Sequence, residues 1–224
     1  MKDIAGAKED TAEISRRSGE VREGRINMEA EDRVKKPLDS DIGLEALRAE
    51  CAGCEKCPLG KTRTNSVFGT GNPEAKLMFV GEAPGEQEDL SGTPFVGRAG
   101  QLLDRFLFAV DIKREDVYIA NILKCRPPKN RDPLPAEEDA CMDWLRGQVR
   151  IIRPKIIVCL GRIAAMRLIS PDYRISQQHG QWVEKGSFFM TAVFHPAALL
   201  RDPRRKADML EDMKSIAAKL EELG

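Results

Sequence analysis

The segment KLMFVGEAPGEQED, residues 76–89, constrains the fold most strongly, because an apolar run ends there in a loop punctuated by glycine and proline. Residues 77–80 are apolar throughout and bounded by turn formers, which predicts a short buried strand. In an open α/β sheet, ligands bind beyond the carboxyl ends of the strands. The loop that contains Gly81, Ala83 and Gly85 is therefore the first candidate binding site, and its glycines would let backbone N–H groups approach a ligand closely.

Similar apolar segments predict strands over residues 117–120, 156–160 and 188–194. Helical patterns lie between and after them, over residues 136–151, 162–169 and 207–223. These strands and helices alternate along the chain, which is typical of an α/β fold.

The composition limits the class of protein. The chain has 224 residues, enough for one domain with a substantial core, and its hydrophobic content of 42% excludes wholesale disorder. No apolar run approaches the roughly 18 residues that a membrane helix needs, and no secretory signal is recognisable. We therefore expect a cytoplasmic protein without membrane contact. The formal net charge is zero, so nucleic-acid binding would need a local basic patch.

The chain divides into two parts at about residue 39. Residues 1–39 are densely charged with both signs mixed and offer little apolar surface, which predicts a flexible N-terminal extension. Residues 40–224 are expected to form a single α/β domain. A short amphipathic helix over residues 38–49 leads into the first cysteines.

Six cysteines in a cytoplasmic chain favour a metal or redox site over disulfides. They are Cys51, Cys54, Cys57, Cys125, Cys141 and Cys159. One closely spaced pair and two separated thiolates would supply four soft ligands, which suit either a [4Fe–4S] cluster or a structural zinc. Cys159 lies within the apolar run IIVCLG and is expected to be a buried core residue, while the role of Cys51 stays open.

Three side chains next to the predicted strands are candidates for base recognition. Asn121 ends the second strand, and its amide offers a donor and an acceptor that complement the imide edge of a pyrimidine such as uracil. His195 directly follows the fourth strand and could stabilise charge on a leaving group. Phe95 lies among turn residues and could stack on a flat ligand. Each residue also has a purely structural interpretation: Asn121 as a turn former, His195 as a structural histidine and Phe95 as a core aromatic residue.

Two basic segments could contact a phosphate backbone. The first follows Asn121 and contains Lys124, Arg126, Lys129 and Arg131. In the second, the leucines of HPAALLR precede Arg201, Arg204, Arg205 and Lys206, an arrangement typical of an apolar wedge held among cations. His179, the second histidine, is expected to be exposed and without a chemical role.

Four motifs in order, GEAPGEQED, GTPFVGRAG, NILKCRPPKNR with Cys141 beyond it, and HPAALLR, resemble those of the family 4 uracil-DNA glycosylases, the iron–sulfur branch of that superfamily. The resemblance extends from about Leu44 to the C-terminus. It implies a three-layer α/β/α sandwich with a central four-stranded parallel sheet and a [4Fe–4S] cluster remote from the catalytic pocket. The cysteine pattern of the family implies that the cluster ligands are Cys54, Cys57, Cys125 and Cys141.

The resemblance also implies roles for individual residues. Phe95 would stack on an extruded uracil, Asn121 would read its imide edge, and His195 would bind the oxygen on which negative charge develops. The loop with Gly81, Ala83 and Gly85 would contact base and sugar, Leu199 would fill the gap in the duplex, and Arg201, Lys129 and Arg131 would contact DNA. A related branch has an aspartate at the position of Ala83, so the group that positions water is unsettled. Glu82 is the carboxylate nearest in sequence to Ala83 and is the candidate for positioning water. Its alternative role is structural, holding the loop through backbone N–H groups.

The expected function is excision of uracil from single- or double-stranded DNA by hydrolysis of the N-glycosidic bond, a step of base excision repair. We expect a monomer, with replication or repair proteins as further partners. One alternative is a glycosylase of broader base preference. The other is a non-catalytic iron–sulfur or zinc module that binds nucleic acid.

Overall fold

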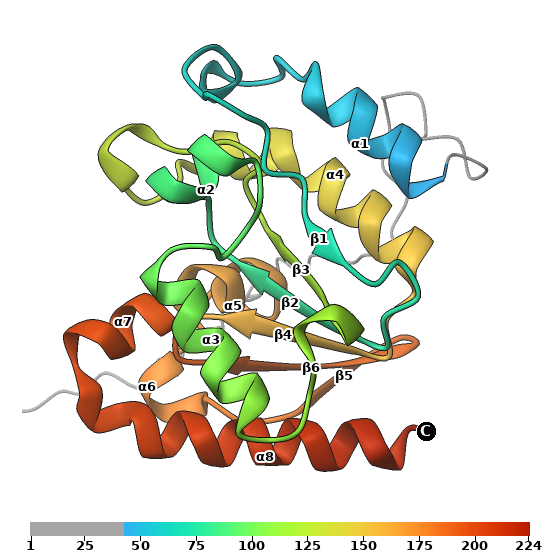
Figure 1. Ribbon diagram of the computed structural model, residues 1–224, viewed down its shortest axis with the longest axis vertical. Helices are drawn as coiled ribbons and strands as arrows, with labels where there is room; N and C mark the ends of the chain where they lie inside the picture. The colour runs from blue at the N-terminus through green and yellow to red at the C-terminus, as the bar shows by residue number, and fades with distance from the viewer. Residues whose placement is uncertain (1–42) are drawn as a thin grey trace, which may run out of the picture.

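The computed structural model describes residues 43–224, so the predicted N-terminal extension lies outside the described residues. A six-stranded sheet with strand order β1-β3-β2-β4-β6-β5 runs through the molecule. Helices lie on both faces of this sheet (Figure 1). The predicted three-layer α/β/α architecture is confirmed.

The four central strands of the sheet are mutually parallel. They are β3 (Tyr118–Asn121), β2 (Leu77–Gly81), β4 (Ile156–Leu160) and β6 (Phe188–Val193). The predicted four-stranded parallel sheet is thereby confirmed as the centre of a larger one. Two short antiparallel strands, β1 (Thr70–Gly71) and β5 (Val183–Lys185), extend its edges. With two and three residues, they are too short to produce a recognisable sequence period.

The helices form two groups. One face of the sheet packs against α1 (Leu44–Ala52), α4 (Pro135–Ile152) and α5 (Arg162–Leu168). The other face packs against α3 (Arg98–Phe108), α7 (Pro196–Arg201) and α8 (Lys206–Glu222). The remaining helical segments are α2 (Glu86–Ser91), α6 (Ile175–Gln178) and the short 3₁₀ turns Pro58–Lys61, Arg114–Asp116, Pro128–Asn130 and Pro203–Arg205.

Strand β2 illustrates why the central strands are apolar throughout. Met78 and Val80 belong to the core beneath α1, α4 and α5, whereas Leu77 and Phe79 belong to the core beneath α3 and α8. Since successive side chains of a strand point to opposite faces, a sheet covered on both sides needs apolar residues at every position. This is the continuous pattern from which the strand was predicted.

The parallel arrangement brings the loops after β2, β3 and β6 to one edge of the sheet. Gly81 pairs directly with Asn121 at the ends of β2 and β3. His195 follows β6 and is the N-cap of α7, so the leucines after it lie on a helix. Within residues 43–224, no helix is both long and apolar enough to span a membrane.

Candidate functional site

Gly81, Phe95 and Asn121 come together at the carboxyl ends of β2 and β3. A Cβ atom on Gly81 would lie 2.4 Å from the Asn121 Oδ1 atom and 2.7 Å from the Phe95 Cζ atom. Such distances are far below van der Waals contact, so only glycine leaves room at this position. The structure thus places three of the predicted site residues around one point.

The Asn121 side chain has a buried acceptor without a donor. The residue is 2% exposed, and within the described part of the chain its Oδ1 atom has no hydrogen-bond partner. Buried polar atoms are nearly always paired, and leaving one unpaired costs roughly 1–3 kcal/mol. The position therefore suits a ligand that brings an N–H group to Oδ1.

The Phe95 loop is held in an unusual conformation. Phe95 has a φ angle of 54°, in the left-handed region that bulky residues rarely adopt, and is 6% exposed. Glu88 holds the next turn, because its Oε1 atom accepts hydrogen bonds from the backbone N–H groups of Val96 at 3.0 Å and Gly97 at 2.9 Å. We infer that this clamp fixes the direction of the Phe95 ring.

His195 lies beside Phe95, with ring centroids 5.7 Å apart. Its Nδ1 atom accepts a hydrogen bond from the Ala197 backbone N–H at 3.1 Å, so in a neutral ring the proton must be on Nε2. Burial, and then the positive charge of Arg201, lower the pKa of His195 to about 4. At neutral pH the imidazole is therefore uncharged, with Nε2–H available as a donor.

Glu82 lies in the loop after β2 and is half-buried. Burial, followed by the negative charge of Asp132, raises the pKa of its carboxyl to about 7. Its side chain makes no hydrogen bond within residues 43–224, so the alternative that it holds the loop through backbone N–H groups is wrong. The carboxylate of this motif that does accept from backbone N–H groups is Glu88, and its partners are Val96 and Gly97 in the Phe95 loop.

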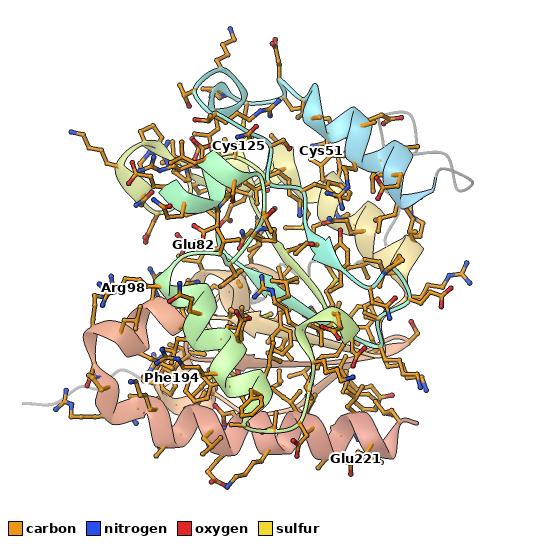
Figure 2. All side chains as sticks on the ribbon, viewed as in Figure 1. Cys51, Glu82, Arg98, Cys125, Phe194 and Glu221 are labelled. Atoms are coloured by element: carbon orange, nitrogen blue, oxygen red, sulfur yellow. The ribbon has the colours of Figure 1, made fainter. Side chains whose placement is uncertain are left out.

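Five cysteines line a common hollow between α1 and α4. They are Cys51, Cys54, Cys57, Cys125 and Cys141. Figure 2 shows Cys51 and Cys125 near the top of the molecule, above Glu82. Cys159 lies apart from them in β4 and is fully buried, as predicted. All six are free thiols, without disulfides.

The sulfur atoms of this hollow accept hydrogen bonds from three directions. Cys125 accepts from the Arg63 guanidinium at 3.1 Å, Cys141 from the Lys124 backbone N–H at 3.2 Å, and Cys54 from the Trp144 indole at 3.4 Å. Within residues 43–224, no group of three or more His, Cys, Asp or Glu side chains is placed to hold a single metal ion. Soft donors spread around a hollow, with N–H groups aimed at sulfur, fit a multi-iron cluster held by thiolates.

The structure corrects the predicted basic patch. Lys124 is 1% exposed and therefore cannot belong to a surface cluster. Arg131 donates two hydrogen bonds to the buried Glu137 carboxylate, at 2.9 and 2.6 Å, so much of its charge is neutralised within the protein. Lys129 and Arg201 are exposed and form no ion pair within the described residues. Of the three cations to which the resemblance assigns DNA contacts, these two have an available charge.

Two further predictions are wrong because they missed tertiary packing. Leu199 was expected to be exposed among cations, but it is 1% exposed and packs in the core beneath α3 and α8, while its neighbour Leu200 is 37% exposed. His179 was expected to be exposed, but its Nδ1 atom lies 2.8 Å from the Asp212 carboxylate and its ring packs on Phe194.

The sequence analysis missed the structural importance of Glu88, Lys124 and Gln148. Glu88 lies in the recognised GEAPGEQED motif, but which carboxylate of that motif meets the backbone N–H groups depends on how the loop turns. Gln148 could have been recognised from the sequence, because it is a polar residue on an otherwise apolar helix face. It is fully buried, and a buried polar side chain needs hydrogen-bond partners inside the protein.

Comparisons with known proteins agree with the geometry of the site. Residues 68–220 match the model of the uracil DNA glycosylase superfamily. The chain belongs to this superfamily. It is 46% identical to a type-4 uracil-DNA glycosylase of Archaeoglobus fulgidus over 183 residues, which cover 77% of this chain and 91% of the relative.

Two further relatives place the chain within the superfamily. It is 44% identical to a type-4 uracil-DNA glycosylase of Thermotoga maritima, over 71% of this chain and 84% of the relative. The identity is lower, 33%, with a type-5 uracil-DNA glycosylase of Pyrobaculum aerophilum, over 66% of this chain and 79% of the relative. The resemblance to the family 4 branch that the motifs indicated is confirmed.

The electrostatic state of His195 can be tested directly. Because its pKa is lowered to about 4, we expect ¹⁵N NMR of the folded protein to show a neutral ring, protonated at Nε2, from neutral pH down to about pH 5. A His179→Gln variant assigns the signals, since the chain has two histidines. Protonation of His195 near the ordinary value of about 6.5 would contradict this state.

Proposed function

We propose that this superfamily member hydrolyses the N-glycosidic bond of deoxyuridine in DNA and leaves an abasic site, as in base excision repair. The observation that carries the proposal is the buried, unpaired Oδ1 atom of Asn121 beside Gly81 and Phe95. The N3–H group of uracil would supply the missing donor. Cytosine has an acceptor at N3 instead, so it would leave the Asn121 oxygen unpaired and face it with a like partial charge.

The reaction requires that the base leave the helical stack. A flipped uracil would stack on Phe95 while backbone groups of the loop with Gly81, Ala83 and Gly85 contact base and sugar. As the glycosidic bond breaks, positive charge develops on the sugar and negative charge on the base. Groups that bind these charges more tightly than the intact nucleotide lower the barrier.

His195 is the donor that we assign to the base anion. Its Nδ1 atom is occupied by the Ala197 N–H group, so the neutral ring offers Nε2–H to the uracil oxygen on which charge develops. A neutral donor can act at this position without first losing or gaining a proton. Preorganised donors of this kind typically contribute about 2.7–4 kcal/mol to barrier lowering.

Excision of uracil from a labelled oligonucleotide tests both assignments. His195→Ala and Asn121→Ala should each lower the single-turnover rate by about a hundredfold or more, because each removes a contact to the departing base. His179→Gln, which replaces the other histidine while keeping a donor for Asp212, serves as the matched control and should retain the rate. Wild-type excision by His195→Ala or Asn121→Ala would overturn the corresponding role.

Glu82 is our candidate for orienting the attacking water. A carboxyl group can take up a proton from that water, and bind it by a charge-assisted hydrogen bond, only when it is ionised; the pKa of Glu82 is raised to about 7. The ionised fraction therefore grows as pH rises through about 7, whereas His195, with a pKa of about 4, stays neutral over the same interval.

A pH profile of the single-turnover rate examines this role. We expect the rate to rise through about pH 7 in the wild-type protein. In Glu82→Gln the profile should become flat and the maximum rate should fall by about tenfold or more. If the glutamine variant keeps the same rise with pH, the titrating group is another residue.

We further propose that Cys54, Cys57, Cys125 and Cys141 hold a [4Fe–4S] cluster. The shared hollow and the three N–H groups bonded to its sulfur atoms support this ligand set. Bound there, the cluster would supply a structural cross-link between the segment after α1, the loop after β3 and helix α4. Cys51 lines the same hollow, and its sulfur lies 3.5 Å from the Ser66 hydroxyl.

Metal analysis of two matched variants checks the ligand set. Wild-type protein purified without oxygen should be brown and contain about four irons per chain. Cys125→Ser should lose iron and visible absorption, whereas Cys159→Ser, altered at the buried cysteine of β4, should retain both. Zinc in place of iron, or full iron content in Cys125→Ser, would contradict the proposal.

The residues that we assign to DNA contact are chosen because their side chains are exposed. We propose that Lys129 and Arg201 bind phosphates and that Leu200, not Leu199, enters the gap left by the flipped base, because Leu200 is the exposed leucine of α7. We also propose that residues 40–224 act as a monomeric domain on single- or double-stranded DNA. Six free thiols suit the reducing cytoplasm, where replication or repair proteins would be the partners.

A further inference from the structure

Lys124 is a buried cation whose direct partners are neutral. Its side chain is 1% exposed, and its Nζ atom donates to the main-chain carbonyl of Asn121 and to Gln148 Oε1, each at 2.7 Å. Within residues 43–224, no carboxylate forms an ion pair with it. A buried ammonium that lacks opposite charge is costly, so a counter-charge should lie nearby.

The cysteine-lined hollow can supply this counter-charge. Lys124 lines the hollow together with Cys125 and Cys141, and its backbone N–H donates to the Cys141 sulfur at 3.2 Å. Cysteines that ligate iron are thiolates, so the hollow becomes negative when the cluster is bound. The same lysine therefore contacts the base-reading residue on one side and the ligand set on the other.

Gln148 makes this connection rigid. Its Nε2 atom donates to the Phe68 carbonyl at 2.8 Å and to the Tyr118 hydroxyl at 3.1 Å, which leaves Oε1 facing Lys124. Gln148 and Cys141 lie seven residues apart on α4, about two helical turns, and so share one face. A single helix thus fixes both a proposed cluster ligand and an anchor of the lysine.

We propose that Lys124 is a positioning residue that couples the cysteine-lined hollow to uracil recognition by holding the main chain of Asn121. The ammonium, balanced by thiolates of the hollow, fixes the Asn121 carbonyl where β3 ends, and this fixes the direction of the Asn121 side chain. The inference rests on the proposed function, since it assigns Lys124 to the same reaction. It explains how a cluster remote from the base would affect excision.

Lys124→Met removes the charge while keeping an unbranched apolar side chain. We expect its kcat/KM on a deoxyuridine oligonucleotide to fall about 10- to 100-fold, because small misplacements of a recognition group have effects of this size. Inhibition by free uracil should weaken in parallel, whereas affinity for abasic-site DNA should not change. Lys185→Met is the matched control, since Lys185 also donates to two main-chain carbonyls, those of Leu168 and Ile169, and lies in β5.

A double-mutant cycle separates positioning from general destabilisation. If Lys124 acts through Asn121, adding Lys124→Met to Asn121→Ala should cause little further loss of excision. An equal loss in both backgrounds would overturn the inference. Gln148→Met, which keeps the lysine but removes its anchor, should show the same dependence on Asn121 with a smaller loss, and it provides the test if Lys124→Met does not fold.

The cluster offers a readout independent of activity. Removing a positive charge beside the cluster should make its reduction potential more negative in Lys124→Met, with Lys185→Met unchanged. Unchanged potential together with wild-type excision in Lys124→Met would overturn this inference alone. A wild-type protein that binds DNA but excises no uracil would instead overturn the proposed function.

Discussion

The parallel pairing of β2 with β3 is the constraint on which the site depends. It sets Gly81 directly opposite Asn121, and the missing side chain of the glycine leaves space that Asn121 and Phe95 border. Parallel strands need crossover connections, and both faces of the sheet must be covered by helices. The ligand-facing groups are therefore confined to the carboxyl edge of the sheet, where His195 also lies.

The segment from Asn121 to Cys125 joins the carboxyl end of β3 to the cysteine-lined hollow within five residues. The Asn121 Oδ1 atom is an unpaired acceptor at the end of β3, Lys124 is buried with its ammonium against the Asn121 carbonyl, and Lys124 and Cys125 both line the hollow. Helix α4 supports the segment through Gln148 and Cys141, which accept hydrogen bonds from the side chain and the backbone of Lys124 respectively. Such connected polar groups are stable in a core only when each finds a partner. The Asn121 Oδ1 atom is the exception in this segment, and its missing partner is the basis of the recognition role that we propose for it.

The placement of residues at the strand ends was predicted correctly for a simple reason. The apolar runs locate the central strands, and the carboxyl ends of parallel strands share one edge, so Gly81, Asn121 and His195 all lie at that edge. Exposure of neighbouring side chains was predicted poorly. Leu199 and Leu200 are identical in type and adjacent in sequence, yet only the rotation of α7 against the core decides which of them is buried.

The sequence by itself determined the α/β class, the positions of the central strands and the family, because these depend on local hydrophobic pattern and on motifs. Only the tertiary structure decided which charges are available and which are buried. Arg131 is neutralised by Glu137, and Lys124 is enclosed between a carbonyl, an amide and the cysteines. The reason is physical, because ion pairing and burial depend on residues that are distant in sequence. The local pattern of apolar and charged residues does not tell how far apart such residues lie in the folded protein.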